Sequence, residues 1–200
     1  MNSVDICNMA LSQLKAKSIL SMGDQSEEAM QCKRFYDVIR QNLLRRHEWS
    51  FAKRMKALTL TDHNIPGWQF AYGYPEDCLF VRMIFNEAGV KYFKDQLDYY
   101  DIYSINESER VLVCNVEKAY LEYTYDLVDV KMFPPDFVKL FYHALAAELA
   151  IPLSANEGYQ STNYSLYQKA LEEAAIENHN ERKEEAVFAS QIMKARNEGD

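Results

Sequence analysis

Glycine is scarce in this chain of 200 residues, and its six glycines are scattered. None has the spacing of a Gly-rich loop, in which backbone N–H groups come close enough to a phosphate to bind it. Histidine is scarce as well, and the histidines form no HExxH or paired arrangement of the kind that holds zinc. They are His47, His63, His143 and His179. These absences argue against nucleotide chemistry and a zinc centre, and we expect no cofactor.

The cysteines give no sign of a disulfide framework or a metal site either. The four cysteines, Cys7, Cys32, Cys78 and Cys114, are widely spaced, form no CxxC pair and follow no secretory signal. We therefore expect reduced, buried thiols in a chain made in a cytoplasm.

Positive charge is in deficit, with 22 basic against 30 acidic residues and a net charge of −8. This balance argues against a general polyanion binder. The basic residues are nevertheless concentrated between residues 33 and 56, and five of them could face DNA or another partner: Arg40, Arg45, Arg46, Lys53 and Arg54. A solvated helix face or a contact with acidic protein is the favoured interpretation, and a nucleic-acid-binding module that uses residues 33–56 is an alternative.

The longest strongly apolar run is Phe133 to Leu153, and it predicts one buried helix. Pro134 and Pro135 suit a first helical turn, and Pro152 is expected to end the helix. Apolar side chains surround almost the whole circumference, so packing partners must approach from several sides. We expect the run to be too short and too interrupted to span a bilayer.

Two amphipathic helices are expected before this run. Apolar residues at helical spacing follow Ser3, which predicts a first helix over residues 3–17 with Ser3 as its N-cap. A second helix follows Gly23, with Asp24 and Glu27 as a capping box. The two helices are expected to pack together as a hairpin.

The middle of the chain changes to aromatic and β-branched residues. Alternation predicts half-buried antiparallel strands over residues 79–85 and 119–125, and shorter strands near 90–93 and 110–114, with a tyrosine-rich link over 99–105. An earlier pair of extended runs flanks the turn residues between Asp62 and Gly67. After the buried run, periodic apolar residues between Tyr164 and Ala175 predict a fourth helix.

This order of elements predicts an α+β fold, a helical bundle of about four helices with an inserted antiparallel β region. We expect an N-terminal helical hairpin over 1–48, the β-rich insertion over 49–130, helices completing the bundle over 131–176, and a polar tail over 177–200 that is mobile until it binds a partner.

Four carboxylates near strand ends are candidates for acid and base catalysis on a glycan: Glu76, Asp77, Asp126 and Asp129. Their positions beside prolines and turns favour structural turn and capping roles. We therefore expect no catalytic residue, and keep a peptidoglycan hydrolase as an alternative.

Four segments together resemble a known family. They are Asn8-Met9-Ala10-Leu11, Trp49-Ser50-Phe51-Ala52, the run from Ala71 through Tyr74-Pro75-Glu76-Asp77 to Leu79, and Phe133 to Leu149. In order and spacing they are similar to the head-to-tail adaptors of short-tailed bacteriophages, the tail tubular protein A family. Lys15 departs from the pattern, because relatives commonly have glycine there. Beyond Ile176 the chain matches only in being polar and helical.

The resemblance implies a non-enzymatic structural protein of the virion tail, synthesised in the cytoplasm of a bacterial host. It would form a ring of twelve copies that joins the portal to the tail nozzle and surrounds the path of the DNA. Net acidity suits such a channel, because a basic lining would bind phosphates and retard DNA passage. A hydrolase activity is ascribed to some tail tubular proteins, which keeps the alternative above in view.

Two partner contacts are expected from residue type and position. Tyr92, Tyr99, Tyr100 and Tyr103 exceed what one small sheet can bury, which predicts a contact with the next tail component or with tail fibres. In the tail, Val187, Phe188, Ile192 and Met193 form an apolar stripe that predicts docking into the portal. No contact with a membrane is expected.

Overall fold

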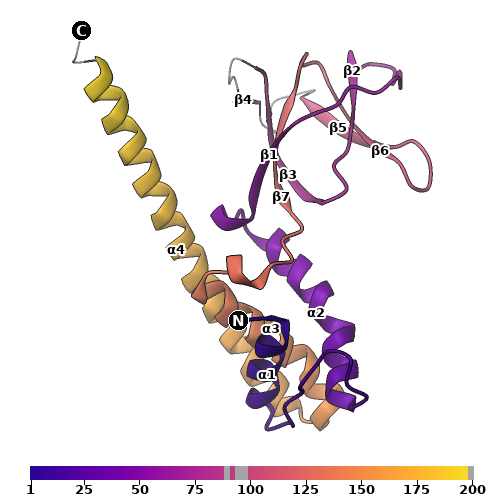
Figure 1. Cartoon of the computed structure of the whole chain (residues 1–200), viewed down its shortest axis with the longest axis vertical. Helices are drawn as coiled ribbons and strands as arrows, with labels where there is room; N and C mark the ends of the chain where they lie inside the picture. The colour runs from indigo at the N-terminus through magenta and orange to yellow at the C-terminus, as the bar shows by residue number, and fades with distance from the viewer. Residues whose placement is uncertain (88–90, 93–98, 198–200) are drawn as a thin grey trace. The chain divides into compact units, whose positions relative to one another are not determined.

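The computed structural model describes the backbone of residues 1–87, 91–92 and 99–197, and the side chains of the same residues except 91–92 and 182–197. The chain divides into two compact units (Figure 1). The helical unit comprises residues 1–51 and 127–200, and the β unit comprises residues 52–126. The fold is α+β, as predicted, with four α-helices and two small antiparallel sheets in the described residues.

The first helix, α1 (Ser3–Gln13), is shorter than expected and is capped by Asn2 rather than by Ser3. Asn2 and Asp5 form a reciprocal capping box, which satisfies N–H groups at the start of the helix. The helix ends because Lys15 turns into the left-handed region, with φ of 55°. The backbone N–H of Ala16 then bonds back to the carbonyl of Leu11.

The second helix, α2 (Glu27–Arg46), is capped by Ser26, so the expected capping box of Asp24 and Glu27 is wrong. Asp24 is unavailable as a cap because its carboxylate accepts the N–H groups of Leu20 and Ser21. The expected hairpin is also not the main packing. Both α1 and α2 pack chiefly against the third helix, and contacts between α1 and α2 are few.

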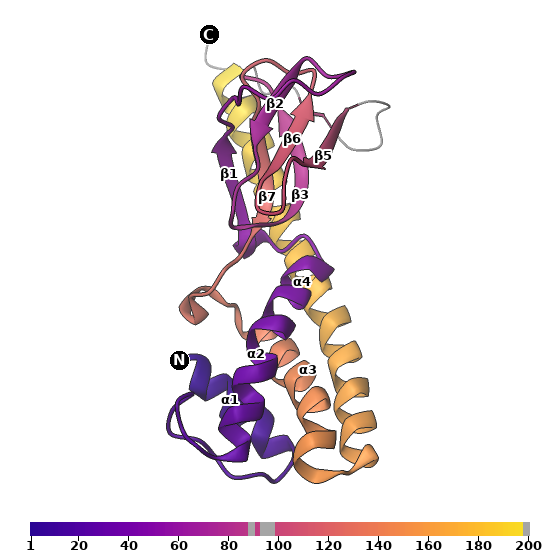
Figure 2. The ribbon, with the colours of Figure 1, turned by 90° about the vertical axis from the view of Figure 1, so that its right-hand side faces the viewer.

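The third helix, α3 (Pro135–Ser154), is the centre of the helical unit (Figure 2). Its N-terminal half buries the aromatic side chains Phe137 and Phe141 among Trp49 and Tyr36 of the preceding segments. Pro152 lies inside the last turn, so the expectation that it ends the helix is wrong. The chain continues to Ser154, and Ala155 ends the helix in the left-handed region with φ of 48°.

At 20 residues, α3 is long and apolar enough to cross a membrane by length and composition alone, so its length does not exclude a span as expected from the sequence. Its burial accounts for the composition, however. Half or more of its residues are buried, and helices α1, α2 and α4 all pack against it. It is the core helix of the unit.

The fourth helix, α4 (Glu157–Asn197), is continuous over 41 residues. The helix therefore continues past residue 176, where the bundle helices were expected to end, as far as Asn197. Residues 177–197 are rich in Glu, Lys, Arg and Ala and contain no proline or glycine, and such residues favour helix. Asn178 is also buried against the turn at residues 48–50, which anchors α4 past the expected end.

In the β unit, one sheet has the strand order β1-β7-β3-β4 and the other β2-β6-β5. The first comprises β1 (Lys53–Ala57), β7 (Tyr120–Tyr125), β3 (Cys78–Phe85) and β4 (Lys91–Tyr92), and the second comprises β2 (Phe70–Gly73), β6 (Arg110–Cys114) and β5 (Tyr100–Ser104). All pairings are antiparallel. The predicted strands over 79–85, 110–114 and 119–125 are confirmed to within one residue.

The two sheets share one core, since a single cluster of buried side chains draws on both. Leu112 of β6, Leu121 of β7 and Ile84 of β3 are all inaccessible to solvent. The segment expected to be a tyrosine-rich link contains β5, which pairs with β6 from Tyr100 opposite Cys114 to Ser104 opposite Arg110.

Candidate functional site

Of the four candidate catalytic carboxylates, Asp77 makes structural contacts with both of its oxygens. Asp77 forms an ion pair with Arg54 through Oδ2, and its Oδ1 accepts a hydrogen bond of 3.0 Å from the hydroxyl of Tyr123. Burial raises the pKa of Tyr123 to about 12, and the carboxylate of Asp77 adds to the rise. Both oxygens of Asp77 are thus engaged in holding β1 and β7 to the turn before β3.

The other three carboxylates lie in different surroundings. Asp126 donates its backbone N–H to the backbone carbonyl of Asp77 at 2.8 Å. Asp129 belongs to the helical unit, where its side chain caps the short 3-10 helix η2 (Val130–Met132). Glu76 is exposed at the edge of a hollow of about 440 Å³ formed by residues 56–59 and 73–77. This hollow presents only Glu76 and Asp77 as carboxylates.

His143 is buried in the helical unit, and its partner is Asn163. The Asn163 amide donates to the carbonyl of Tyr159 at 3.0 Å, so its oxygen faces His143 and accepts from Nδ1 at 3.3 Å. Burial lowers the pKa of His143. Within the described residues, no group of three His, Cys, Asp or Glu side chains is placed to hold a metal ion.

All four cysteines are free thiols in the structure, and their burial confirms that part of the expectation. The Sγ of Cys7 lies 3.6 Å from the Sδ of Met22. The neighbouring thiol of Cys32 and burial both raise the pKa of Cys7. Cys7 and Cys32 are both fully buried, so we interpret both as packing residues.

The five basic candidates do not form one surface. Arg40 is 2% exposed, bonds to Asp37 at 3.1 Å and donates to the carbonyl of Leu127 at 2.8 Å, so its expected role facing DNA or a partner is wrong. It lies four residues from both Tyr36 and Leu44, on the inner face of α2. Arg45 and Arg46 are exposed at the end of α2, whereas Lys53 and Arg54 belong to β1 in the β unit.

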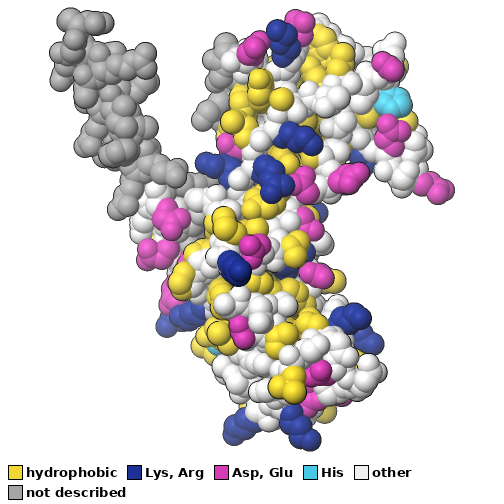
Figure 3. Space-filling model, in the orientation of Figure 1, with side chains coloured by type: hydrophobic (Ala, Val, Ile, Leu, Met, Phe, Trp, Pro, Cys, Tyr) yellow, Lys and Arg dark blue, Asp and Glu magenta, His cyan; other side chains and the backbone are white. Residues whose placement is uncertain are grey.

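Arg54 is also occupied, by Asp77 and by the ring of Tyr125, whose centroid lies 3.7 Å from the guanidinium carbon. On the face of the helical unit drawn in Figure 3, Lys and Arg side chains lie apart among acidic and apolar ones. This distribution does not favour the nucleic-acid-binding alternative, which needs basic side chains that converge.

The tyrosine candidates divide by burial. Tyr99 and Tyr100 are 7% and 9% exposed, so the expectation that they offer a contact surface is wrong. The hydroxyl of Tyr99 accepts the N–H of Ile84 at 2.9 Å and donates to its carbonyl, and the two tyrosine rings pack edge to face. Tyr103 is 39% exposed. The side chain of Tyr92 lies outside the described residues.

The side chains of the expected portal-docking residues, Val187, Phe188, Ile192 and Met193, also lie outside the described part of the chain. Their backbone belongs to α4.

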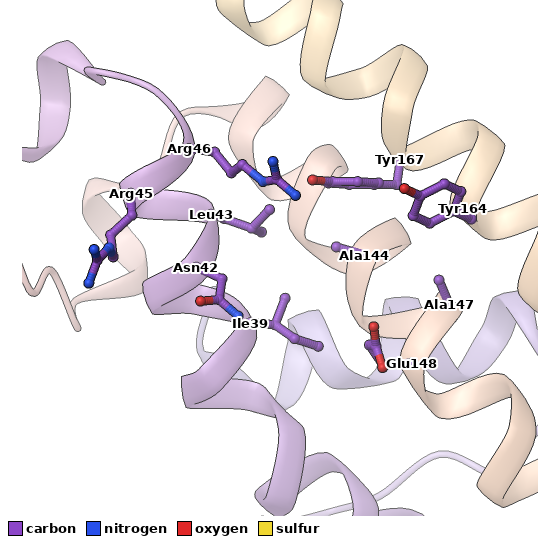
Figure 4. Close-up of a pocket in the computed structure, with 10 residues that line it drawn as sticks. All are labelled: Ile39, Asn42, Leu43, Arg45, Arg46, Ala144, Ala147, Glu148, Tyr164 and Tyr167. Carbon is purple, nitrogen blue, oxygen red and sulfur yellow. The ribbon is translucent and has the colours of Figure 1, made fainter. Parts of the chain in front are cut away.

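The helical unit also has a concave surface, a groove, that sequence reasoning did not identify. We call it the α2–α4 groove: α2 and α4 form its walls and α3 forms its floor (Figure 4). Its volume is about 450 Å³. The residues that line it are Ile39, Asn42, Leu43, Arg45, Arg46, Ala144, Ala147, Glu148, Tyr164 and Tyr167.

Part of the groove floor is formed by short side chains, because Ala144 and Ala147 lie about one turn apart on the same side of α3. Arg46 extends from the α2 wall toward Tyr167, whereas Arg45 is directed away from the groove (Figure 4). A second hollow adjoins it, sharing Ala147, Glu148 and Tyr164 and adding the half-exposed Ile151. The only sequence signal for the groove was the alanine-rich second half of the buried helix.

Neither a comparison of the chain with protein-family models nor one with curated proteins gives a match.

Proposed function

We propose that the chain is the subunit of a head-to-tail adaptor in the tail of a short-tailed bacteriophage. Copies form a ring, twelve by resemblance to the tail tubular protein A family, that joins the portal to the tail nozzle and encloses the DNA channel for genome retention and ejection. The role is structural, without enzymatic turnover. DNA passes through the channel without sequence-specific binding.

The observation that carries this proposal is what the residues of the resemblance do in the fold. Asn8 binds the backbone of Ile19 with both ends of its amide, at 2.8 and 3.0 Å. Trp49 is fully buried and donates from Nε1 to the carbonyl of Leu43 at 2.8 Å. Asp77 links Arg54 and Tyr123. These residues hold segments together, as expected of a scaffold protein rather than of residues arranged around a substrate.

Exposed apolar side chains on the helical unit also support a role in assembly. They include Leu20, Met30, Val38, Val128, Met132, Ile151 and Ile176, each at least 40% exposed. A subunit in a ring buries surface on more than one side, so scattered apolar contact points are expected of it.

The end of α4 is the proposed portal contact. The described side chains of α4 are anchored as far as Asn178, and the helix continues to Asn197. Val187, Phe188, Ile192 and Met193 fall in this last part and supply apolar residues to a partner groove. In the β unit, Tyr103 is the one predicted contact tyrosine that is exposed in the described side chains, and Ile102 is exposed beside it on β5.

The test is binding to purified portal rings, measured by co-sedimentation, with the full chain and with a chain ending at Glu181. We expect the full chain to bind and the shortened chain to keep its fold but lose binding. A peptidoglycan-release assay runs beside it. Turnover by the full chain that is lost in Glu76→Ala/Asp77→Ala while portal binding persists would support the hydrolase alternative instead.

A further inference from the structure

The most exposed large apolar side chain on the described surface is Leu20, which is 93% exposed. It lies in the connection between α1 and α2, which we call the Leu20 loop (residues 18–24). An isolated leucine so completely in water has no packing role within its own subunit. A single exposed leucine is ordinary, but the backbone on both sides of this one is fixed by hydrogen bonds.

The Leu20 loop is held in shape by side-chain hydrogen bonds on both sides of the leucine. Before it, Asn8 binds both the N–H and the carbonyl of Ile19, and Ile19 itself is buried. After it, the Asp24 carboxylate accepts the N–H groups of Leu20 at 2.8 Å and Ser21 at 3.2 Å. The N–H of Gly23 bonds to the Ser21 hydroxyl at 2.9 Å. The leucine is thus presented on a preorganised loop, which reduces the entropy lost on binding.

The α2–α4 groove lies on the other side of α3 from α1. Phe141 of α3 contacts Tyr36 of α2, and His143 bonds to Asn163 of α4, which fixes the sides of α3 that face these two helices. At about 100° per residue, the groove floor falls between those two sides. Ala146 and Leu149 lie on the opposite side and are fully buried. The remaining helix that packs on α3 is α1, so it covers them.

In one orientation of the loop, its charges are complementary to those of the groove. Lys17 precedes Leu20 and Asp24 follows it, with Glu27 and Glu28 beyond. The groove carries Arg46 on the α2 wall and Glu148 on the floor (Figure 4). In the orientation that seats Leu20 between the two groove charges and turns the acidic residues after it toward Arg46, Lys17 lies on the side of Glu148.

We propose that the Leu20 loop of one copy of this chain binds in the α2–α4 groove of a second copy. The leucine side chain enters over the alanine floor, between the aromatic wall of Tyr164 and Tyr167 and the α2 wall. Because loop and groove are different surfaces on opposite sides of α3, the contact is heterologous, and copies add head to tail. This deepens the proposed function, on which it rests for the closure of the copies into a ring.

Cysteine cross-linking tests the contact. Leu20→Cys protein is mixed with Asn42→Cys protein at high concentration under a mild oxidant, and Asn42 is an exposed residue of the groove wall. The native cysteines are buried and do not compete. We expect a disulfide-linked dimer containing one of each variant, because the two Cα atoms must come within about 7 Å to be bridged. The control replaces Asn42→Cys by Ile176→Cys, an exposed apolar position on α4 outside the groove. Equal yields with the two partners, or no mixed dimer, would overturn the proposal.

Leu20→Asp measures the same contact without a cross-link. Since Leu20 is exposed, we expect the melting temperature to stay unchanged while self-association, followed by sedimentation equilibrium, weakens at least about tenfold. Ile176→Asp is the matched control and is expected to leave self-association unchanged. Association that survives Leu20→Asp in full contradicts the proposal. The adaptor function is tested separately by portal binding. A mixed dimer without portal binding would contradict the adaptor function and support the contact between copies. Portal binding without a mixed dimer would support the adaptor function and contradict the contact.

Discussion

Asn178 joins the middle of α4 to the turn at Ser50, which lies 128 residues earlier in the chain. Its Oδ1 accepts both the backbone N–H of Ser50 at 2.7 Å and the Ser50 hydroxyl at 2.8 Å, and its Nδ2 donates to the carbonyl of Glu48 at 3.2 Å. Asn178 is 4% exposed. This single amide anchors α4 where its apolar periodicity has ended.

Asn178→Ala is expected to lower the free energy of unfolding by about 1–3 kcal/mol, because it leaves the partly buried Ser50 N–H and hydroxyl without their acceptor. Limited proteolysis should then cleave α4 near Asn178 sooner than in the native chain. Asn180→Ala is the control, since Asn180 is exposed on the same helix. Equal stability of the two variants in urea titrations would show that the anchor contributes nothing.

Lys15→Gly is expected to stabilise the chain by about 0.5–1 kcal/mol. Lys15 has φ of 55°, a conformation that glycine adopts without steric cost and lysine does not. Thermal unfolding measures the effect. Lys17→Gly serves as the control: Lys17 is exposed and is not among the residues with positive φ, so glycine there should be neutral or destabilising. The prediction fails if both glycine variants unfold at lower temperature than the native chain.

The lowered pKa of His143 predicts that the stability of the chain depends on pH. Burial lowers its pKa, and the charge of Lys139 adds to the lowering, while the hydrogen bond to Asn163 opposes it. The unfolded chain, with an ordinary pKa of about 6.5, therefore binds this proton more readily than the folded chain. The stability from neutral His143 is present in full above about pH 6.5 and is lost as the pH falls, with a slope of at most about 1.4 kcal/mol per pH unit.

Urea titrations between about pH 5 and 7 measure that slope, and His143→Gln should reduce it because glutamine keeps an amide donor but does not titrate. His179→Gln is the control, because His179 is exposed. An unchanged slope in His143→Gln would mean that another group carries the dependence.

Asp77→Ala is expected to destabilise the β unit by about 1–2 kcal/mol, since it removes the acceptor of the Tyr123 hydroxyl and the partner of Arg54. The ion pair is half exposed and contributes only a small part of this, because solvent screens it. The same change should lower the pKa of Tyr123, which an ultraviolet absorbance titration reads directly. Glu76→Ala, one residue away and exposed, should change stability by less than about 0.5 kcal/mol. If Glu76→Ala is the more damaging change, the assignment of Asp77 as the structural carboxylate is wrong.

Local patterns predicted the parts of the fold that depend on periodicity. The alternation in β3 and β7 and the apolar spacing of α1 and α2 reflect burial of one face, and the nearly all-apolar run of α3 reflects burial on several sides. The errors concern partners that only the folded chain supplies. Asp24 looks like a helix cap, yet its carboxylate binds the N–H groups of Leu20 and Ser21. Arg40 looks like an exposed base, yet Leu127, 87 residues away, supplies a carbonyl to it.

The tyrosines illustrate the same limit in the β unit. Tyr99 and Tyr100 look like an excess of aromatic surface because a single sheet cannot bury them. A second sheet forms when β5 pairs with β6, and the shared core encloses both rings. The α2–α4 groove could not be predicted either, because it depends on how α2 and α4 pack against the alanines of α3.

The most direct test of the adaptor role is an electron cryomicroscopy reconstruction of the chain bound to its portal. We expect a closed ring of copies around a continuous central channel that is coaxial with the portal. We also expect the C-terminal ends of α4 to contact the portal. Single copies bound to the side of the portal, or an assembly without a central channel, would contradict the proposed function.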